Sequence, residues 1–187
     1  GVTSDVWSYN PTDIVRITRQ CMEGTAMDTI HPWVKDFKGT VEPVRNQDEL
    51  VGYKVSGVME KKDDGRVVIT ELYPGKYLDT YIGWLRDKCE FVTGVETEGT
   101  EKTVHLEVTG TFPESREELM KKLRMSTTWY TTHMNAFESV NDEVVLNQYD
   151  VHAIVHAHSK VATDIYTKRR LHEIGVLEED IRQKTEK

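Results

Sequence analysis

A long central stretch of this chain, residues 39–146, carries the periodicity of β-strands, and helical patterns flank it on both sides. Residues 103–109 alternate between apolar and polar side chains, as expected for a strand with one buried face. The turn signal Asp63-Asp64-Gly65 lies between two further strand-like runs, residues 52–58 and 66–72, which predicts an antiparallel hairpin. The sequence therefore predicts a mixed, largely antiparallel sheet with flanking helices, a fold of the α/β (α+β) class.

Helix signals stand before, within and after the strand-rich stretch. A first helix is expected before it, a short one over residues 77–88, another after a capping box, and a long one near the C-terminus. The residues that give these signals are Asn10, Pro11, Gly24, Ser115, Glu118 and Asp150. We therefore expect an α/β domain over residues 1–150, followed by a protruding helix over residues 151–187 whose apolar stripe runs from Ile154 to Tyr166.

Two further regions, residues 125–137 and 141–148, also carry strand or turn signals. Residues 125–137 are rich in Thr, Trp and Tyr and predict a strand. Asn141 and Asp142 predict a turn that leads into a further strand over residues 143–148.

The charge of the chain sets a limit on its partners. The 187 residues carry a net charge of −8 and the pI is about 5.4. Taken alone, this charge argues against a nucleic-acid partner, because phosphate contacts need Lys and Arg. Basic residues nevertheless gather in short clusters, so a local basic face is compatible with the acidic total.

The chain shows no targeting or disulfide pattern. No apolar run approaches the roughly 20 residues that a membrane helix needs, and no signal peptide is visible, so no membrane partner is expected. Cys21 and Cys89 are far apart and lack a CxxC motif, which predicts reduced thiols in an intracellular protein. The chain opens at Gly1 rather than Met, and we interpret it as part of a longer protein.

No motif in the chain predicts an active site. The sequence lacks GxSxG, GxGxxG and a phosphate-binding loop with its lysine. His152 and His156 are spaced to share one helical face, but His158 falls on nearly the opposite side, and two ligands are too few for zinc. Polar residues on a packed helix are the favoured interpretation of these histidines.

One loop interleaves aromatic and basic residues just before a strand. Trp33, Lys35, Phe37 and Lys38 have the pattern of a loop that binds a nucleic-acid backbone. An equally favoured alternative is that the two aromatic residues anchor the core and the two lysines are ordinary surface residues.

Several motifs resemble one family when they are taken in order. Residues 31–42 resemble the MHPWYKGFKGTIE run of eukaryotic-type type II DNA topoisomerases, and residues 9–15 resemble the helix start NPREIV of the same family. Residues 68–72 resemble its EITEL, and residues 124–137 resemble its KLTTTISTSNMVCF. Tyr149 and Asp150 resemble the KKYDT at which the family's C-gate helix begins. The order and spacing of these motifs cover almost the whole chain.

The resemblance implies that this chain is the tower segment of the DNA-binding and cleavage core, running into the coiled-coil C-gate. In that family the tower contacts the flanks of a cleaved, bent duplex, so double-stranded DNA is the implied partner. The residues expected to contact phosphate are Lys35, Lys38 and Arg124, with Arg16, Lys121 and Lys122 behind them.

The resemblance also implies which functions lie outside the chain. The family's nucleophilic tyrosine, Mg²⁺-binding cluster and ATPase lie upstream of Gly1, so no catalytic residue and no cofactor are expected here. Mg²⁺ and ATP are implied for the parent enzyme, which is expected to be a homodimeric isomerase of the nucleus or another DNA-containing compartment. The alternatives are a stand-alone α/β module that binds a protein partner, and a small enzyme built around a buried pocket.

Overall fold

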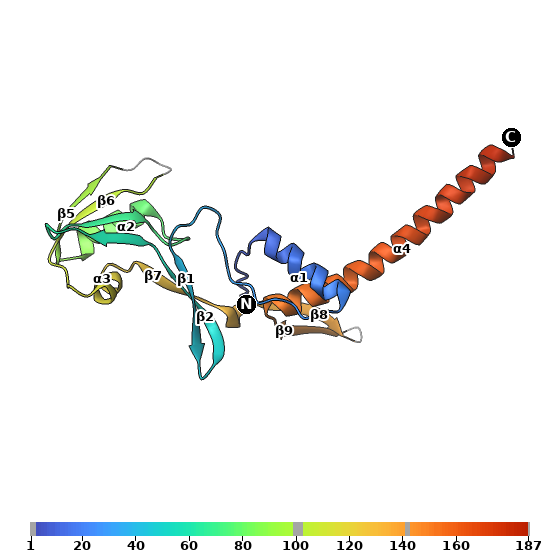
Figure 1. Ribbon diagram of the computed structural model, residues 1–187, viewed down its shortest axis with the longest axis horizontal. Coiled ribbons are helices and arrows are strands. Elements are labelled where there is room, and N and C mark those ends of the chain that lie inside the picture. Colours follow the sequence, from blue (N-terminus) through green and yellow to red (C-terminus); the bar gives the residue numbers. More distant parts are fainter. Residues whose placement is uncertain (1–2, 99–102, 141–142, 187) are drawn as a thin grey trace. The chain divides into compact units, whose positions relative to one another are not determined.

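The structure of the protein is a computed structural model that describes residues 3–98, 103–140 and 143–186. The chain forms two compact units. The first unit consists of Gly1–Asn10 with His31–His133, and the second of Pro11–Ile30 with Met134–Lys187. Antiparallel sheets with short helices make up the first unit, and a long helix runs to the C-terminal end of the second (Figure 1). The predicted fold class, mixed α/β with largely antiparallel strands and a long C-terminal helix, is confirmed.

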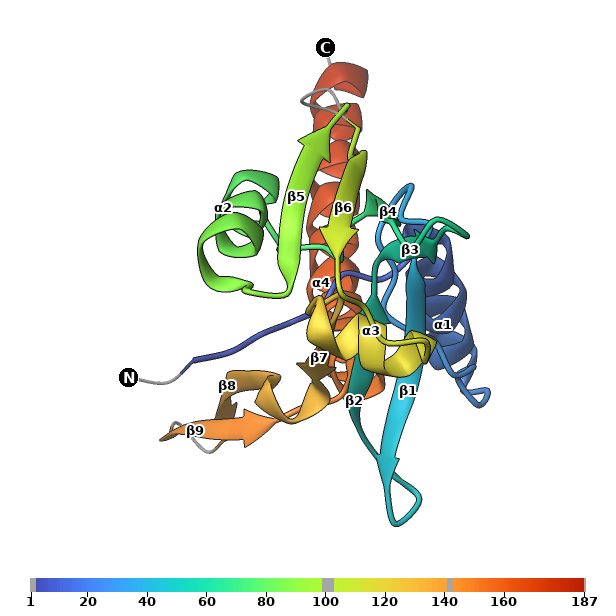
Figure 2. The same cartoon turned by 90° about the vertical axis from the view of Figure 1, so that its left-hand side faces the viewer.

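A four-stranded antiparallel sheet forms the centre of the first unit, with the strand order β3-β4-β6-β5. Its elements are β3 (Val58–Lys61), β4 (Val67–Glu71), α2 (Leu78–Lys88), β5 (Val92–Thr97), β6 (Leu106–Gly110) and α3 (Arg116–Lys122). Figure 2 shows α2 lying along β5, with which it is in contact. Ile69, Leu106 and Val108 are fully buried in one core with Tyr81 and Leu85 of α2. The predicted alternation over residues 103–109 is thus confirmed at Leu106 and Val108.

A second antiparallel sheet of the first unit has the order β1-β2-β7 and consists of β1 (Thr40–Asn46), β2 (Glu49–Ser56) and β7 (Ser126–Tyr130). The N-terminal segment packs on it through Trp7, whose ring stacks on Trp129 with centroids 4.7 Å apart. Trp7 Nε1 also donates a hydrogen bond of 3.0 Å to the carbonyl oxygen of Tyr130.

The predicted hairpin has the right turn but the wrong first strand. Residues 52–58 contribute to two strands of different sheets, since β2 ends at Ser56 and β3, which begins at Val58, is the partner of β4. Gly57 separates the two strands, and its N–H donates to the carbonyl oxygen of Met125 over 2.9 Å. A Cβ at this position would collide with the carbonyl oxygen of Glu71, so only glycine permits such a close approach of two backbones.

Other local predictions also need correction. Helix α3 follows Ser115 as expected, but the Ser115 side chain makes no capping hydrogen bond, and the backbone bond from Leu119 N to Ser115 O begins the helix. Residues 125–137 form a strand, a 3₁₀ turn (Thr131–His133) and the start of another strand. A tertiary contact at that turn, from Asp5 N to His133 O, overrides the strand propensity of its threonines. Strand β5 was missed, because Gly94 interrupts its weak alternation.

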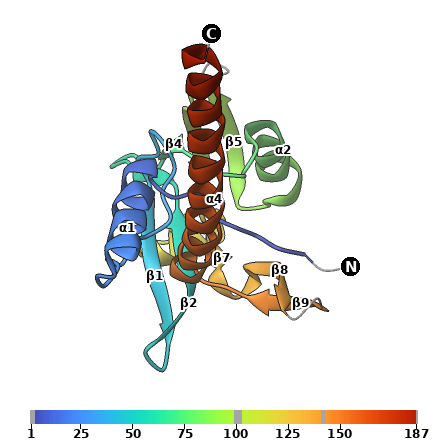
Figure 3. The same cartoon turned by 90° about the vertical axis from the view of Figure 1, so that its right-hand side faces the viewer.

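The second unit consists of α1 (Pro11–Glu23), the hairpin of β8 (Asn135–Val140) and β9 (Glu143–Gln148), and α4 (Val151–Thr185). Figure 3 shows α1 alongside α4, and the two helices are in contact. Asp150 Oδ1 accepts a hydrogen bond of 2.7 Å from Ala153 N, which confirms the predicted cap. Gly24, with a φ of 70°, follows α1 as expected. The predicted turn at Asn141 and Asp142 lies outside the described residues.

The buried residues of the described part of helix α4 lie near its N-terminal end. Val155 and Ser159 are buried, but the predicted apolar stripe continues through Val161, Ile165 and Tyr166, which are more than half exposed. Every residue of the described range 163–186 is exposed. Among the described residues, no helix combines the length and the apolar character needed to cross a membrane. The predicted functional division after residue 150 differs from the division into compact units and stays a prediction.

Candidate nucleic-acid interface

The loop that contains Lys35 and Lys38 is fixed through its backbone. Trp33 N donates to Ser8 O, and Ser8 Oγ donates to Trp33 O, each over 2.8 Å. Lys38 N donates to the Glu71 carboxylate over 2.8 Å, which ties the loop to the end of β4. Trp33 is 39% exposed, so it is not a core anchor. The loop therefore presents two exposed lysines from a constrained backbone.

Helix α3 presents the second group of predicted cations. Lys121 is exposed at its end, and Lys122 Nζ donates to Thr111 O over 3.1 Å while lying 4.3 Å from the centre of the Phe91 ring. Arg124 follows the helix with a φ of 50°, and its guanidinium lies 4.6 Å from the centre of the Trp84 ring. Lys122 and Arg124 are thus held over aromatic surfaces, which fixes the positions of their charges.

Sequence reasoning missed one cation beside Arg124. Lys76 Nζ donates to Arg124 O over 2.8 Å and lies over the rings of Tyr73, Tyr81 and Trp84, 4.9, 4.5 and 5.8 Å from their centres. These groups line a pocket of the first unit. The sequence signal near this residue is the Pro74-Gly75 pair. It predicts a turn just before Lys76, but it does not indicate which residues surround the Lys76 side chain.

Burial, and then the positive charge of Arg124, lower the pKa of Lys76 to about 8. The buried hydroxyl of Tyr81 donates to Leu123 O over 2.7 Å, and burial raises the pKa of Tyr81. This side of the pocket is therefore a cationic and aromatic surface, and such a surface can bind an anion.

The lowered pKa of Lys76 predicts how stability depends on pH. Between about pH 8 and the ordinary lysine value of 10.5, the unfolded chain binds more protons at Lys76 than the folded chain does. The free energy of unfolding of the wild type, relative to that of Lys76→Met, is therefore expected to rise over this window and to be level below about pH 7. Urea denaturation from about pH 6.5 to about pH 9.5 measures it, and parallel curves for the two proteins would contradict the prediction.

The other predicted cation, Arg16, has a different environment. It lies on α1 in the second unit and forms ion pairs with Asp13 at 2.7 Å and Asp28 at 2.8 Å. No carboxylate among the described residues forms an ion pair with the side chain of any other predicted cation or of Lys76. Among the described residues, the predicted cations of the first unit therefore have no ion-pair partner, whereas two carboxylates compensate the charge of Arg16.

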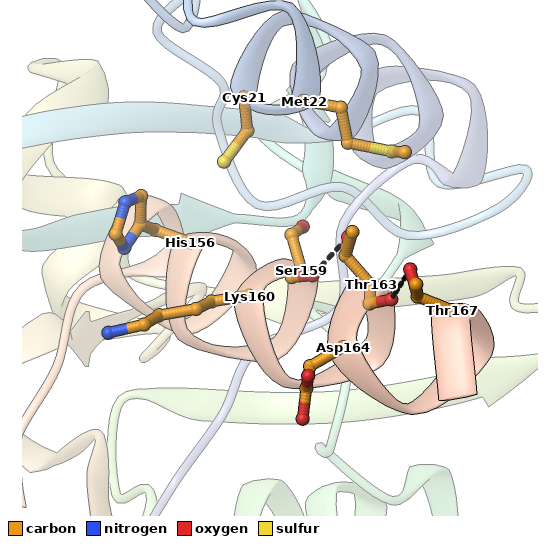
Figure 4. Close-up of a pocket in the computed structure, with 8 residues that line it drawn as sticks. All are labelled: Cys21, Met22, His156, Ser159, Lys160, Thr163, Asp164 and Thr167. Atoms are coloured by element: carbon orange, nitrogen blue, oxygen red, sulfur yellow. Dashed lines mark hydrogen bonds between the residues drawn. The ribbon is translucent and has the colours of Figure 1, made fainter.

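A pocket of the second unit lies between α1 and α4 (Figure 4). Cys21 and Met22 face His156 and Ser159 across it, and the buried Ser159 hydroxyl has no hydrogen-bond partner among the residues that the structure describes. His152 instead bonds Asp28 O over 2.8 Å. Within the described parts of the chain, no group of three or more His, Cys, Asp or Glu residues is placed to hold a metal ion. The histidines do not converge on one point.

The cysteines show no disulfide. Cys21 and Cys89 are both free thiols, and Cys89 is buried in the core of the first unit. Burial raises the pKa of the Cys89 thiol, so this residue has the character of a packed core group rather than a nucleophile.

Comparisons with known proteins connect this geometry to a family. The model of the family that comprises the A-type subunits of DNA gyrase and topoisomerase IV matches residues 1–186. The chain is 27% identical over 147 residues to DNA topoisomerase 2 of Arabidopsis thaliana, covering 74% of this chain and 10% of that protein. It is 26% identical over 191 residues to DNA topoisomerase 2 of Penicillium chrysogenum, covering 97% of this chain and 12% of that protein.

A solved structure shares the fold. The crystal structure of the Plasmodium falciparum topoisomerase II DNA-binding, cleavage and re-ligation domain superposes with a TM-score of 0.80 at 23% identity. The match covers 94% of this chain and 24% of that one. The chain thus spans about a tenth of the length of the curated relatives. It belongs to the DNA gyrase/topoisomerase IV family of A-type subunits, and its similarity to eukaryotic DNA topoisomerase 2 confirms the resemblance predicted from its motifs.

Proposed function

We propose that this chain is a DNA-contacting segment of a type II DNA topoisomerase, corresponding to the tower and the start of the C-gate helix. The parent enzyme then passes one duplex through another, with ATP, Mg²⁺ and a homodimeric assembly in the nucleus, as the resemblance implies. The family match and the similarity to eukaryotic relatives support this function over a stand-alone module that binds a protein partner.

One observation carries the proposal: within the described residues, the predicted cations of the first unit form no ion pair, although the whole chain carries a net charge of −8. Lys35 and Lys38 stand on a constrained loop, and Arg124 and Lys121 stand at the end of α3. Both segments are tied by hydrogen bonds to neighbouring strands of the first unit, Lys38 N to Glu71 at the end of β4 and Met125 O to Gly57 N between β2 and β3. We propose that their cations act as a group.

The proposed role is electrostatic. Lysine and arginine side chains that contact phosphate fix the position of a duplex and release counterions, but they do not read its sequence. Arg16 contributes least, because two carboxylates already compensate its charge. We assign the chemical steps, Mg²⁺ and ATP to other segments of the parent enzyme.

The test is to map the contact surface by NMR on the ¹⁵N-labelled chain during addition of a duplex of about 20 base pairs. We expect the amide shift changes to concentrate at residues 34–39 and 121–124 and to reverse at about 1 M salt, where surface charges are screened beyond roughly 3 Å. Changes confined to α4, or no changes at low salt, would contradict the assignment.

A further inference from the structure

Two cations share one pocket in the first unit, and neither has an ion-pair partner in the described part of the chain. We propose that Lys76 and Arg124 together bind a single phosphate group of the duplex backbone, with the rings of Tyr73 and Trp84 forming the walls of the site. This inference rests on the proposed function and adds to it a defined site and one residue, Lys76, that the sequence motifs do not indicate.

Electrostatic repulsion between the two side chains favours a bound anion. Lys76 and Arg124 have like charges, and Lys76 Nζ contacts the backbone of the same arginine over 2.8 Å. Throughout the described residues, no carboxylate forms an ion pair with either side chain. Two cations that approach one another in partly buried surroundings repel each other, and a bound anion removes that repulsion.

The two side chains also have unused hydrogen-bonding capacity. The Lys76 ammonium has three donors, of which one bonds Arg124 O and a second reaches the Tyr73 hydroxyl at 3.5 Å. The Arg124 guanidinium has five donors, and within the described residues it makes no hydrogen bond. A phosphate oxygen is the acceptor that both groups can share.

The backbone conformation of Arg124 favours the same site. Its φ of 50° is in the left-handed region, at the position after a helix where glycine is usual. Arg124 N bonds Lys121 O over 3.1 Å, which holds this conformation. A long side chain is thus kept where the backbone favours glycine, as is common where a side chain serves a binding site.

The surroundings favour duplex backbone over a free phosphate compound. The pocket is a small cavity of about 300 Å³ in the unit that also carries the Lys38 loop, whose backbone bonds Glu71, two residues before Tyr73 of the pocket wall. A duplex that contacts Lys35 and Lys38 presents further phosphates along its backbone, and Lys76 with Arg124 would take one of these. A small anion would gain only the contacts within the pocket.

The test compares three variants with the wild type. Lys76→Met keeps the length of the side chain over the aromatic rings and removes its charge. Arg124→Gly removes the guanidinium and relaxes the backbone, so a loss of binding cannot be attributed to unfolding. Lys88→Met is the matched control, because Lys88 is an exposed lysine at the end of α2 outside the pocket. Circular dichroism checks the fold of each variant.

Duplex affinity is measured by fluorescence anisotropy at several salt concentrations. Loss of one phosphate contact is expected to lower the affinity about eightfold at about 0.1 M salt and to make the slope of log K against log salt shallower by about 0.9. We expect this change in Lys76→Met and in Arg124→Gly but not in Lys88→Met. An unchanged slope in both pocket variants would overturn the inference.

A second experiment distinguishes a site for the phosphates of a duplex from a site for a free phosphate compound. Inorganic pyrophosphate is titrated while the fluorescence of Trp84 is followed in a variant whose other three tryptophans are replaced by phenylalanine. Quenching that needs Lys76, without any duplex binding, would leave the anion site standing and refute the proposed function. Quenching that needs Lys76, with duplex binding that is insensitive to Lys76→Met, would assign the site to a free phosphate compound and overturn the duplex assignment.

Discussion

Replacement of Gly57 by alanine is expected to lower the free energy of unfolding of the first unit by about 3 kcal/mol, the upper end of what overpacking usually costs. The new Cβ would collide with the Glu71 carbonyl oxygen and would lie 2.9 Å from Met125 Cε. The Glu71 atom belongs to backbone, so relief requires a shift of β4 against the link between β2 and β3. The hydrogen bond from Gly57 N to Met125 O is strained by the same shift.

The control is the same substitution at Gly83, which lies in α2 and has no atom within 4 Å of an added Cβ. Gly83→Ala is expected to raise the free energy of unfolding by about 0.5–1 kcal/mol through helix propensity. Tryptophan fluorescence during urea denaturation measures both, since all four tryptophans lie in the first unit. Equal effects of the two substitutions would contradict the described junction between the sheets.

Charge reversal in the loop, Lys35→Glu with Lys38→Glu, is expected to lower duplex affinity about 60-fold at about 0.1 M salt. Each lost phosphate contact costs a factor of about eight there, because its counterions are no longer released. Both lysines are exposed, so the fold is expected to persist with a change in stability of only about 0.5 kcal/mol.

The matched control for this variant is Lys88→Glu with Lys184→Glu. Both double variants change the net charge of the chain from −8 to −12, since each of the two reversals replaces a positive charge by a negative one. Both control lysines are exposed and lie outside the loop. If net charge alone governed binding, the two double variants would lose affinity equally, and the loop would have no specific part in the contact.

The sequence predicted those parts of the fold that depend on local signals. Gly24 and Asp150 marked helix boundaries through backbone conformation and capping, and the alternation around Leu106 marked a buried face. The change of sheet at Gly57 was not predictable in this way. Strand periodicity continues across residues 52–58, and the break depends on contacts with Glu71 and Met125, which are distant in the sequence.

The sequence likewise indicated some residues of the candidate site and not others. Lys35 and Lys38 stood in a motif, so the sequence indicated them directly. The environment of the Lys76 ammonium depends on Arg124, which is 48 residues away in the sequence, and on the aromatic rings around it. Arg16 shows the opposite case, because the sequence indicated a basic residue but not the Asp28 carboxylate that compensates it.

The dependence of duplex affinity on salt measures phosphate contact itself, because each contact adds about 0.9 to the slope of log K against log salt. With Lys35, Lys38 and Arg124 each neutralising one phosphate, log K is expected to fall with log salt at a slope of about −3 for the wild type, from roughly 0.9 per contact. The Lys35→Glu, Lys38→Glu variant is expected to retain a slope of about −1. The same slope in both proteins, or no duplex binding by the folded wild type at about 0.05 M salt, would contradict the account of this chain as a DNA-contacting segment.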